Sequence, residues 1–146
     1  MNINYIIGTP FRLNNDCAIV NTLSADWIFR NDNLNIEFIK MYNSKEYLLA
    51  MHNDKQNKPG LALSQKTHDK NIYHLIIRNS YWEKSNINYL EQSLMNLKDE
   101  LIKDNIKEIC FTRQNNYLED FEWIQIEEIL RKIFDNTDIN ILICSY

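Results

Sequence analysis

The chain has 146 residues, of which 45% are apolar and 12% aromatic, and its formal charge is −4 at pH 7. This length and composition predict one domain, residues 1–146, with a packed core. Because the charges form no acidic tail and no basic stripe, the sequence argues against a nucleic-acid partner held by charge. No apolar run reaches the roughly 20 residues of a membrane span, and the first residues lack the charged start of a signal peptide, so we expect an intracellular, cytoplasmic protein with no membrane partner.

The first half of the chain predicts two strands followed by two helices. Ile3 to Ile7 is a short β-rich run, and Ala18 to Leu23 is a second apolar run that follows a turn-forming Asn-Asn-Asp segment. Residues 34–40 carry the mixed apolar face of a helix, and Ser44 can cap a further short helix. A polar loop at 53–60 ends this half.

The clearest helix in the second half runs from Ile87 to Leu101. Its apolar residues advance by three and four positions, which is the spacing of one buried helix face, and Ser85 or Asn86 can cap it. The other elements predicted here are strands at 61–65, 71–77 and 108–111, a helix at 126–134 and a strand at 139–144. The last strand is apolar at nearly every position, which predicts a place inside the sheet. Strands that alternate with helices favour an α/β layer architecture.

The cysteines and histidines give no sign of a metal or of a cofactor. Cys110 and Cys144 lie in apolar runs, which predicts buried thiols, and three cysteines in an intracellular chain argue against a disulfide framework. Cys17 follows a polar stretch and can be exposed, but no histidine is placed to activate it. The three histidines share no metal-ligand spacing, and His74 alternates with apolar neighbours as a strand residue does.

Gly8 and Gly60 are the only glycines in the chain. The common phosphate-binding loops need glycine where backbone amides close on phosphate oxygens. Neither a Walker loop, nor a Gly-x-Gly-x-x-Gly fingerprint, nor a Gly-x-Ser-x-Gly elbow can be written with these two residues. The sequence therefore excludes most nucleotide-dependent and hydrolase classes that use such loops.

Several segments together resemble a known family. The segments N-I-Y-H-L-I-I-R from Asn71, L-E-D-F-E-W from Leu118 and the ending D-I-N-I-L-I-C-S-Y follow the order and spacing of a macro domain. The start I-N-Y-I-I-G-T and the run A-I-V-N-T-L-S-A-D are similar to that family's first two strands. Over essentially its whole length the chain resembles the small O-acetyl-ADP-ribose deacetylase and terminal ADP-ribose protein hydrolase branch. The resemblance implies a three-layer α/β fold with a mixed central sheet flanked by helices.

The ligand loops depart from the family pattern. The resemblance places Thr9 where the family has an aspartate that accepts a hydrogen bond from adenine, and Thr9 has no charge. The family's glycine-rich ribose and pyrophosphate loops read Arg-Asn-Asp-Asn at 30–33 and Asn-Asn-Tyr at 115–117. Asparagine tolerates positive φ, so the turns can persist, but the added side chains and Asp32 should weaken diphosphate binding. In the alternative interpretation, these asparagines are ordinary surface turns on a scaffold that no longer binds the ligand.

The residues that the family uses for hydrolysis are also changed. The resemblance implies a nucleophilic lysine just after the fourth strand and an assisting aspartate in the second loop, and Arg78 and Glu119 stand there. Arginine stays protonated at working pH and cannot supply a free amine, although it can clamp a phosphate. Glu119 is either a general base or a solvated carboxylate beside Asp120. We therefore expect a protein without hydrolase activity, in which Glu119 is the one candidate catalytic residue.

Polar residues at the end of the second predicted strand complete the candidate site, because open α/β sheets bind ligands beyond the carboxyl ends of their strands. Nearby aromatic residues, Trp27, Phe29 and Tyr117, either flank a cleft or pack beneath their own loops. The candidate ligand-binding residues are Thr9, Asn21, Ser24, Asp26, Arg78, Asn115, Asn116 and Tyr117.

Three functions follow from this interpretation. The first is a degenerate macro domain, a pseudoenzyme that binds ADP-ribose or a related nucleotide-derived ligand weakly or in altered form. The second is a macro fold reused to bind or inhibit a protein, as in a viral, phage or mobile-element factor. The third is an active ADP-ribosyl hydrolase that uses Glu119. Titration with ADP-ribose separates the first two, because a ligand that binds the folded state stabilises it.

Overall fold

The computed structural model describes residues 1–29, 33–52, 58–113 and 121–145. Its strands form one sheet in the order β1-β6-β5-β2-β4-β3. They are β1 (Ile3–Ile7), β2 (Cys17–Ser24), β3 (Ala62–Lys66), β4 (Asn71–Arg78), β5 (Glu108–Thr112) and β6 (Asn140–Ser145). β3 is antiparallel to β4 and the other neighbouring pairs are parallel, so the sheet is mixed, as the resemblance implies.

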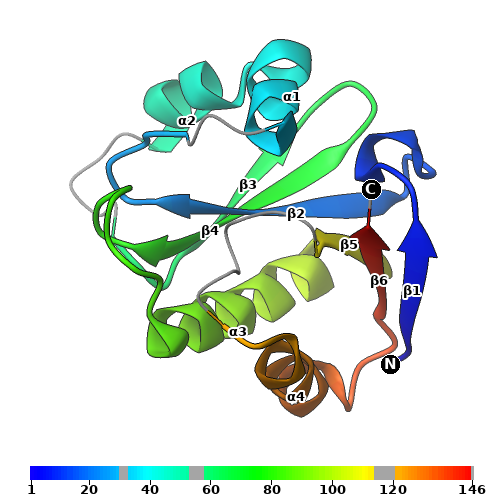
Figure 1. Cartoon of the computed structure of the whole chain (residues 1–146). Coiled ribbons are helices and arrows are strands. Elements are labelled where there is room, and N and C mark those ends of the chain that lie inside the picture. The colour runs from blue at the N-terminus through cyan, green and yellow to red at the C-terminus, as the bar shows by residue number, and fades with distance from the viewer. Residues whose placement is uncertain (30–32, 53–57, 114–120, 146) are drawn as a thin grey trace.

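The helices cover both faces of this sheet. They are the 3-10 helix η1 (Pro10–Arg12) and the α-helices α1 (Asn33–Tyr42), α2 (Ser44–His52), α3 (Ile87–Lys103) and α4 (Trp123–Phe134). Figure 1 shows α1 and α2 on one side of the sheet and α3 and α4 on the other. The predicted three-layer α/β fold is therefore confirmed. In the described part of the chain, no helix is long and apolar enough to span a membrane.

Helix α3 forms where the leucine spacing predicts it. Asn86 caps its first turn, with the side-chain oxygen accepting from the backbone N–H groups of Asn88 and Tyr89 at 2.8 and 3.3 Å. The apolar face of the helix is buried against the sheet at Leu90, Leu94, Leu97 and Leu101. This packing explains why a sequence with many charged residues on its other face still gives a long helix at this place.

Strand β6 lies inside the sheet, between β1 and β5, as its apolar sequence predicts. Ile141 and Ile143 are fully buried in the main core. Only the strand's bounds differ from the prediction, by one residue at each end. Helix α4 begins earlier than predicted, at Trp123, because Glu122 and Gln125 form a reciprocal capping box at its start.

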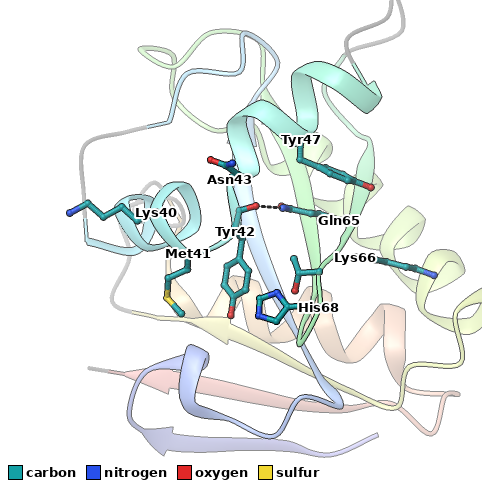
Figure 2. A pocket seen from close by; sticks show the side chains of 9 residues that line it. Lys40, Met41, Tyr42, Asn43, Tyr47, Gln65, Lys66 and His68 are labelled. Carbon is teal, nitrogen blue, oxygen red and sulfur yellow. Dashed lines mark hydrogen bonds between the residues drawn. The ribbon is translucent and has the colours of Figure 1, made fainter.

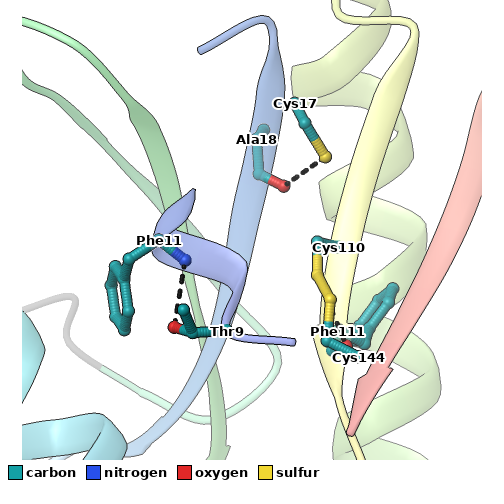
Figure 3. Close-up of a disulfide and its surroundings, with 7 residues drawn as sticks. All are labelled: Thr9, Phe11, Cys17, Ala18, Cys110, Phe111 and Cys144. Atoms are coloured by element: carbon teal, nitrogen blue, oxygen red, sulfur yellow. Dashed lines mark hydrogen bonds between the residues drawn. A yellow bond between two sulfur atoms is a disulfide. The ribbon is translucent and has the colours of Figure 1, made fainter. Parts of the chain in front are cut away.

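The three cysteines lie together on one face of the sheet, and two expectations about them are wrong. Cys17 is 1% exposed, because it is already the first residue of β2 and turns inward toward Cys110 and Cys144. Cys110 and Cys144 are buried as predicted, but the structure joins them by a disulfide rather than leaving two free thiols (Figure 3). The parallel register pairs Thr112 with Cys144, so Cys110, two residues away on β5, faces the same side as Cys144.

Candidate functional site

Two neighbouring parallel strands, β2 and β4, bring the predicted site residues Ser24 and Arg78 together. These two residues are paired across the ladder, after a bulge between Leu23 and Ser24. The backbone beyond β2 remains attached to β4, because the N–H of Ala25 donates to the carbonyl of Arg78 at 2.9 Å. The carboxyl ends of the two strands therefore form one edge, which is where open α/β sheets bind ligands.

Arg78 ends β4 and is only 2% exposed. Its Nη1 donates to Ser85 Oγ at 2.8 Å, so the segment that leads into α3 holds the guanidinium. Arginine does not lose its proton in a protein, and this group is therefore a buried permanent cation. The sequence predicts Ser85 only as a possible cap of the following helix, and sequence spacing does not predict its contact with Arg78.

Asp26 ties the segment after β2 to the segment after β4. Its carboxylate accepts from the Ser24 hydroxyl, from the N–H of Ile28 at 3.1 Å and from the N–H of Tyr81 at 2.8 Å. Ser24 Oγ also lies 3.5 Å from the carbonyl oxygen of Ile28. The polar atoms of Ser24 and Asp26 are thus already used to hold the backbone in place.

Thr9 and Trp27 also make structural contacts. Thr9 caps η1, and its hydroxyl oxygen accepts from the N–H of Phe11 at 3.3 Å. Trp27 is buried in a cluster with Leu23 and Leu48, which supports packing beneath its own loop rather than stacking on a ligand. Neither side chain is freely presented at the edge of the sheet.

Asn21 lies deeper in β2, opposite His74 in the register of β2 with β4. Its Nδ2 lies 3.0 Å from His74 Nδ1, and His74 Nε2 lies 3.0 Å from Gln65 Oε1. Gln65 in turn contacts Ser44 Oγ and the carbonyl of Tyr42, each at 2.7 Å. Burial lowers the pKa of His74 from its ordinary value of 6.5 to about 3, so the imidazole is neutral.

The second predicted loop falls largely outside the described residues, and so do the candidate residues Asn115, Asn116, Tyr117 and Glu119. The first loop, 30–32, is outside them as well. Two aromatic contacts involve described residues on either side of the second loop. The Arg113 guanidinium lies 5.6 Å from the centre of the Trp123 ring, and Trp123 Nε1 donates to the Tyr5 hydroxyl at 3.0 Å.

A pocket of about 330 Å³ lies elsewhere, between the end of α1, the start of α2 and β3. Figure 2 shows Tyr42, Gln65 and His68 among the side chains around it. Its wall includes Lys66, which pairs with Asn71 at the start of β4, so the pocket is at the opposite end of the sheet from Arg78. It is not the predicted ligand site. Within residues 1–29, 33–52, 58–113 and 121–145, no three side chains of the metal-binding types gather to hold an ion.

Known structures have this fold. The macrodomain of Thermus aquaticus DarG superposes with a TM-score of 0.82 at 11% identity and covers 97% of both chains. Thermosipho africanus DarTG in complex with ADP-ribose gives a TM-score of 0.80 at 13% identity, covering 98% of this chain and 42% of that one. The chain thus has the macro-domain fold.

Sequence comparison points to the branch that the sequence motifs resemble. The Bos taurus ADP-ribose glycohydrolase OARD1 is 24% identical over 141 residues, which are 97% of this chain and 90% of that protein. No family model matches the chain. The similarity to a macro domain of the O-acetyl-ADP-ribose deacetylase type, predicted from the sequence, is therefore confirmed.

Proposed function

We propose that this chain binds ADP-ribose, or a related nucleotide-derived ligand, weakly or in altered form, and does not hydrolyse it. Arg78 carries the proposal. It stands where the family resemblance implies a nucleophilic lysine, and a guanidinium cannot act as an amine nucleophile. It is well suited to hold an anion, because its planar fork can donate two parallel hydrogen bonds to a phosphate or carboxylate.

The surroundings of Arg78 support binding rather than chemistry. The guanidinium of Arg78 donates to Ser85 Oγ, and a ligand phosphate could accept a further charge-assisted hydrogen bond from its planar fork. The clamp that Asp26 forms with Tyr81 holds the backbone beside Arg78 in one arrangement without a ligand. A preorganised edge of this kind lowers the ordering cost of binding. The similar protein DarTG, whose structure is a complex with ADP-ribose, supports the choice of ligand.

The binding test is a calorimetric and thermal-shift titration of the whole chain with ADP-ribose. A ligand at 100 times its dissociation constant should stabilise the fold by about 2.7 kcal/mol. Arg78→Lys should weaken binding measurably and leave the fold intact, since lysine offers a point charge in place of the fork. Arg131→Lys, on the exposed side of α4, is the matched control and should leave the affinity unchanged. If Arg78→Lys alters stability but not affinity, Arg78 is a structural residue and the proposal loses its support.

Hydrolysis is tested separately. We expect no release of ADP-ribose from modified glutamate and no deacetylation of O-acetyl-ADP-ribose at a family-like rate. OARD1, named as a glycohydrolase, is the natural positive control. Turnover by this chain would contradict the proposal, and a loss of that turnover in Glu119→Gln would assign it to the third function, a hydrolase that uses this carboxylate.

A protein partner is the second candidate. It is favoured by an exposed aromatic pair, Tyr81 and Trp82, in the segment just after Arg78, with Trp82 73% exposed. Exposed aromatic side chains are common at the centres of protein interfaces. The absence of any stabilisation by ADP-ribose would favour this function over the first.

A further inference from the structure

The buried hydrogen bonds beneath α1 fix the direction of one side-chain amide in the sheet. The carbonyl oxygen of Tyr42 can only accept, so the Gln65 group that faces it at 2.7 Å must be the NH₂ group. Gln65 Oε1 therefore points toward His74 Nε2, at 3.0 Å, and this nitrogen must carry the proton. The Tyr42 carbonyl oxygen thus fixes both the direction of the Gln65 amide and the protonated nitrogen of His74.

The His74 ring in turn fixes the direction of the Asn21 amide. His74 is completely buried beside Phe29 and Phe38 and contacts no carboxylate of residues 1–29, 33–52, 58–113 or 121–145, so it is neutral and its Nδ1 is an acceptor. Asn21 must then present its NH₂ group to His74, at 3.0 Å. Its other amide atom, Oδ1, is buried, has no hydrogen-bond partner among the described residues and can only accept.

Thr112, on the neighbouring strand β5, carries a second buried polar atom on the same face of the sheet as Asn21. β2 and β5 are neighbours, and the register pairs Ile19 with Cys110. The ladder pairing of the two strands ends there, and the alternation of side chains two residues further along each strand puts Asn21 and Thr112 on the same face of the sheet. The hydroxyl oxygen of Thr112 is also buried and has no hydrogen-bond partner in the part of the chain that the structure describes. Leaving such groups unpaired costs about 1 to 3 kcal/mol each, so a fold keeps them where something can bind.

We propose that Asn21 Oδ1 and Thr112 Oγ1 form a subsite for one hydroxyl group of a sugar phosphate, with His74 as the positioning residue that turns the Asn21 amide. This inference rests on the proposed function and specifies which part of the ligand reaches the sheet. A hydroxyl can donate to Asn21 and also bond Thr112, whereas an ionised phosphate has no proton for Asn21. Arg78 lies on the same strand as His74, nearer its carboxyl end. Its guanidinium would bind the anionic part of the same ligand.

The burial of both residues limits what can enter. Asn21 and Thr112 are 1% and 6% exposed. The ligand group that donates to Asn21 must therefore be small and must displace the atoms that cover the Asn21 side-chain amide. A trapped water molecule is the competing occupant, since it too can donate and accept. The two occupants differ in one measurable way, because only the ligand changes the environment of these residues when it is added.

The test uses the labelled whole chain in solution and three probes: ADP-ribose, ribose 5-phosphate and inorganic pyrophosphate. Nitrogen chemical shifts should show His74 protonated at Nε2. The Asn21 side-chain amide and the Thr112 signals should shift with the two sugar phosphates and stay unchanged with pyrophosphate. Thr112→Val, which removes the hydroxyl at constant shape, should raise the dissociation constant for ADP-ribose about three- to tenfold.

Thr22→Val is the matched control. Thr22 is buried with an unpartnered hydroxyl as well, but it neighbours Asn21 on β2 and so faces the other side of the sheet. Its substitution should leave the affinity for ADP-ribose unchanged. Equal effects of the two substitutions would show that the loss at Thr112 is a general packing effect, and would overturn the inference.

The remaining outcomes separate this inference from the proposed function. If ADP-ribose binds while Asn21 and Thr112 do not respond, the proposed function stands and the subsite is wrong. If ribose 5-phosphate shifts both residues but ADP-ribose does not bind, the subsite stands and the proposed function fails. A His74 ring protonated at Nδ1, a response to pyrophosphate, or no response to either sugar phosphate would overturn the subsite.

Discussion

Lowering the pH should destabilise the fold through His74. Burial lowers the pKa of this imidazole to about 3 in the folded state, with a smaller contribution from His52, whereas the unfolded chain should titrate near 6.5. Below pH 6.5 the unfolded chain therefore binds a proton that the folded chain does not. The contribution of His74 to stability is complete above pH 6.5 and is lost as the pH falls from 6.5 toward 3.

The size of this effect follows from the gap between pH 6.5 and the assay pH. At pH 5 the gap is 1.5 units, which corresponds to about 2 kcal/mol at 1.36 kcal/mol per unit. The result barely depends on the folded pKa, provided that it stays below about 4, because the folded state is then neutral at pH 5. Urea unfolding at pH 7.5 and pH 5 measures the difference.

A pair of histidine variants isolates the contribution. His74→Gln keeps hydrogen-bonding capacity at the buried position, and its stability should fall by about 2 kcal/mol less than that of the wild type between the two pH values. His68→Gln, at an exposed side chain, should behave like the wild type. If the His74→Gln and wild-type curves fall in parallel, His74 is not held neutral, and the orientation inferred for Asn21 fails with it.

Two further predictions concern the core. Leu94→Ala, which truncates a fully buried side chain of α3, should cost about 2 to 5 kcal/mol in urea unfolding, whereas Met95→Ala, at a 54% exposed neighbour, should cost under about 0.5 kcal/mol. Similar losses in the two variants would mean that the buried face of α3 is misassigned. Burial raises the pKa of the Cys17 thiol to about 12, with Glu108 adding to the effect, so Cys17 should not react with a thiol reagent at pH 8 until the chain is unfolded. Rapid labelling of the folded protein would show that Cys17 is accessible.

The order of strands and helices could be predicted because each element carries its own periodic signal. The leucines of α3 repeat at helical spacing, and the apolar sequence of β6 fits its place between β1 and β5, with Ile141 and Ile143 in the main core. The apolar pattern predicts a start of α4 at Ile126, later than the observed start at Trp123, because the capping box at Glu122 is polar and gives no apolar signal. Local pattern thus predicts where an element exists better than where it begins.

Contacts between distant residues could not be predicted in this way. Asn21 and His74 are separated by 53 positions, and only the parallel register of β2 with β4 brings them together. Cys17 was misjudged because the polar turn before it suggested exposure, while its own direction is set by the face of β2. For Ser24 and Asp26 the positions were predicted, but not that their polar atoms bond to the backbone of the neighbouring segments.

The position of β1 has a consequence for how the chain reaches this structure. β1 lies at the edge of the sheet, and its ladder partner is β6, which follows it by more than 130 residues. β6 therefore joins β1 to the rest of the sheet, and β1 can find its place only after the most distant segment of the described chain has been made. Until then, an apolar strand with two open edges waits for a partner, and closing so long a loop is slow. Until β6 is made, β1 is therefore open to pairing with other chains.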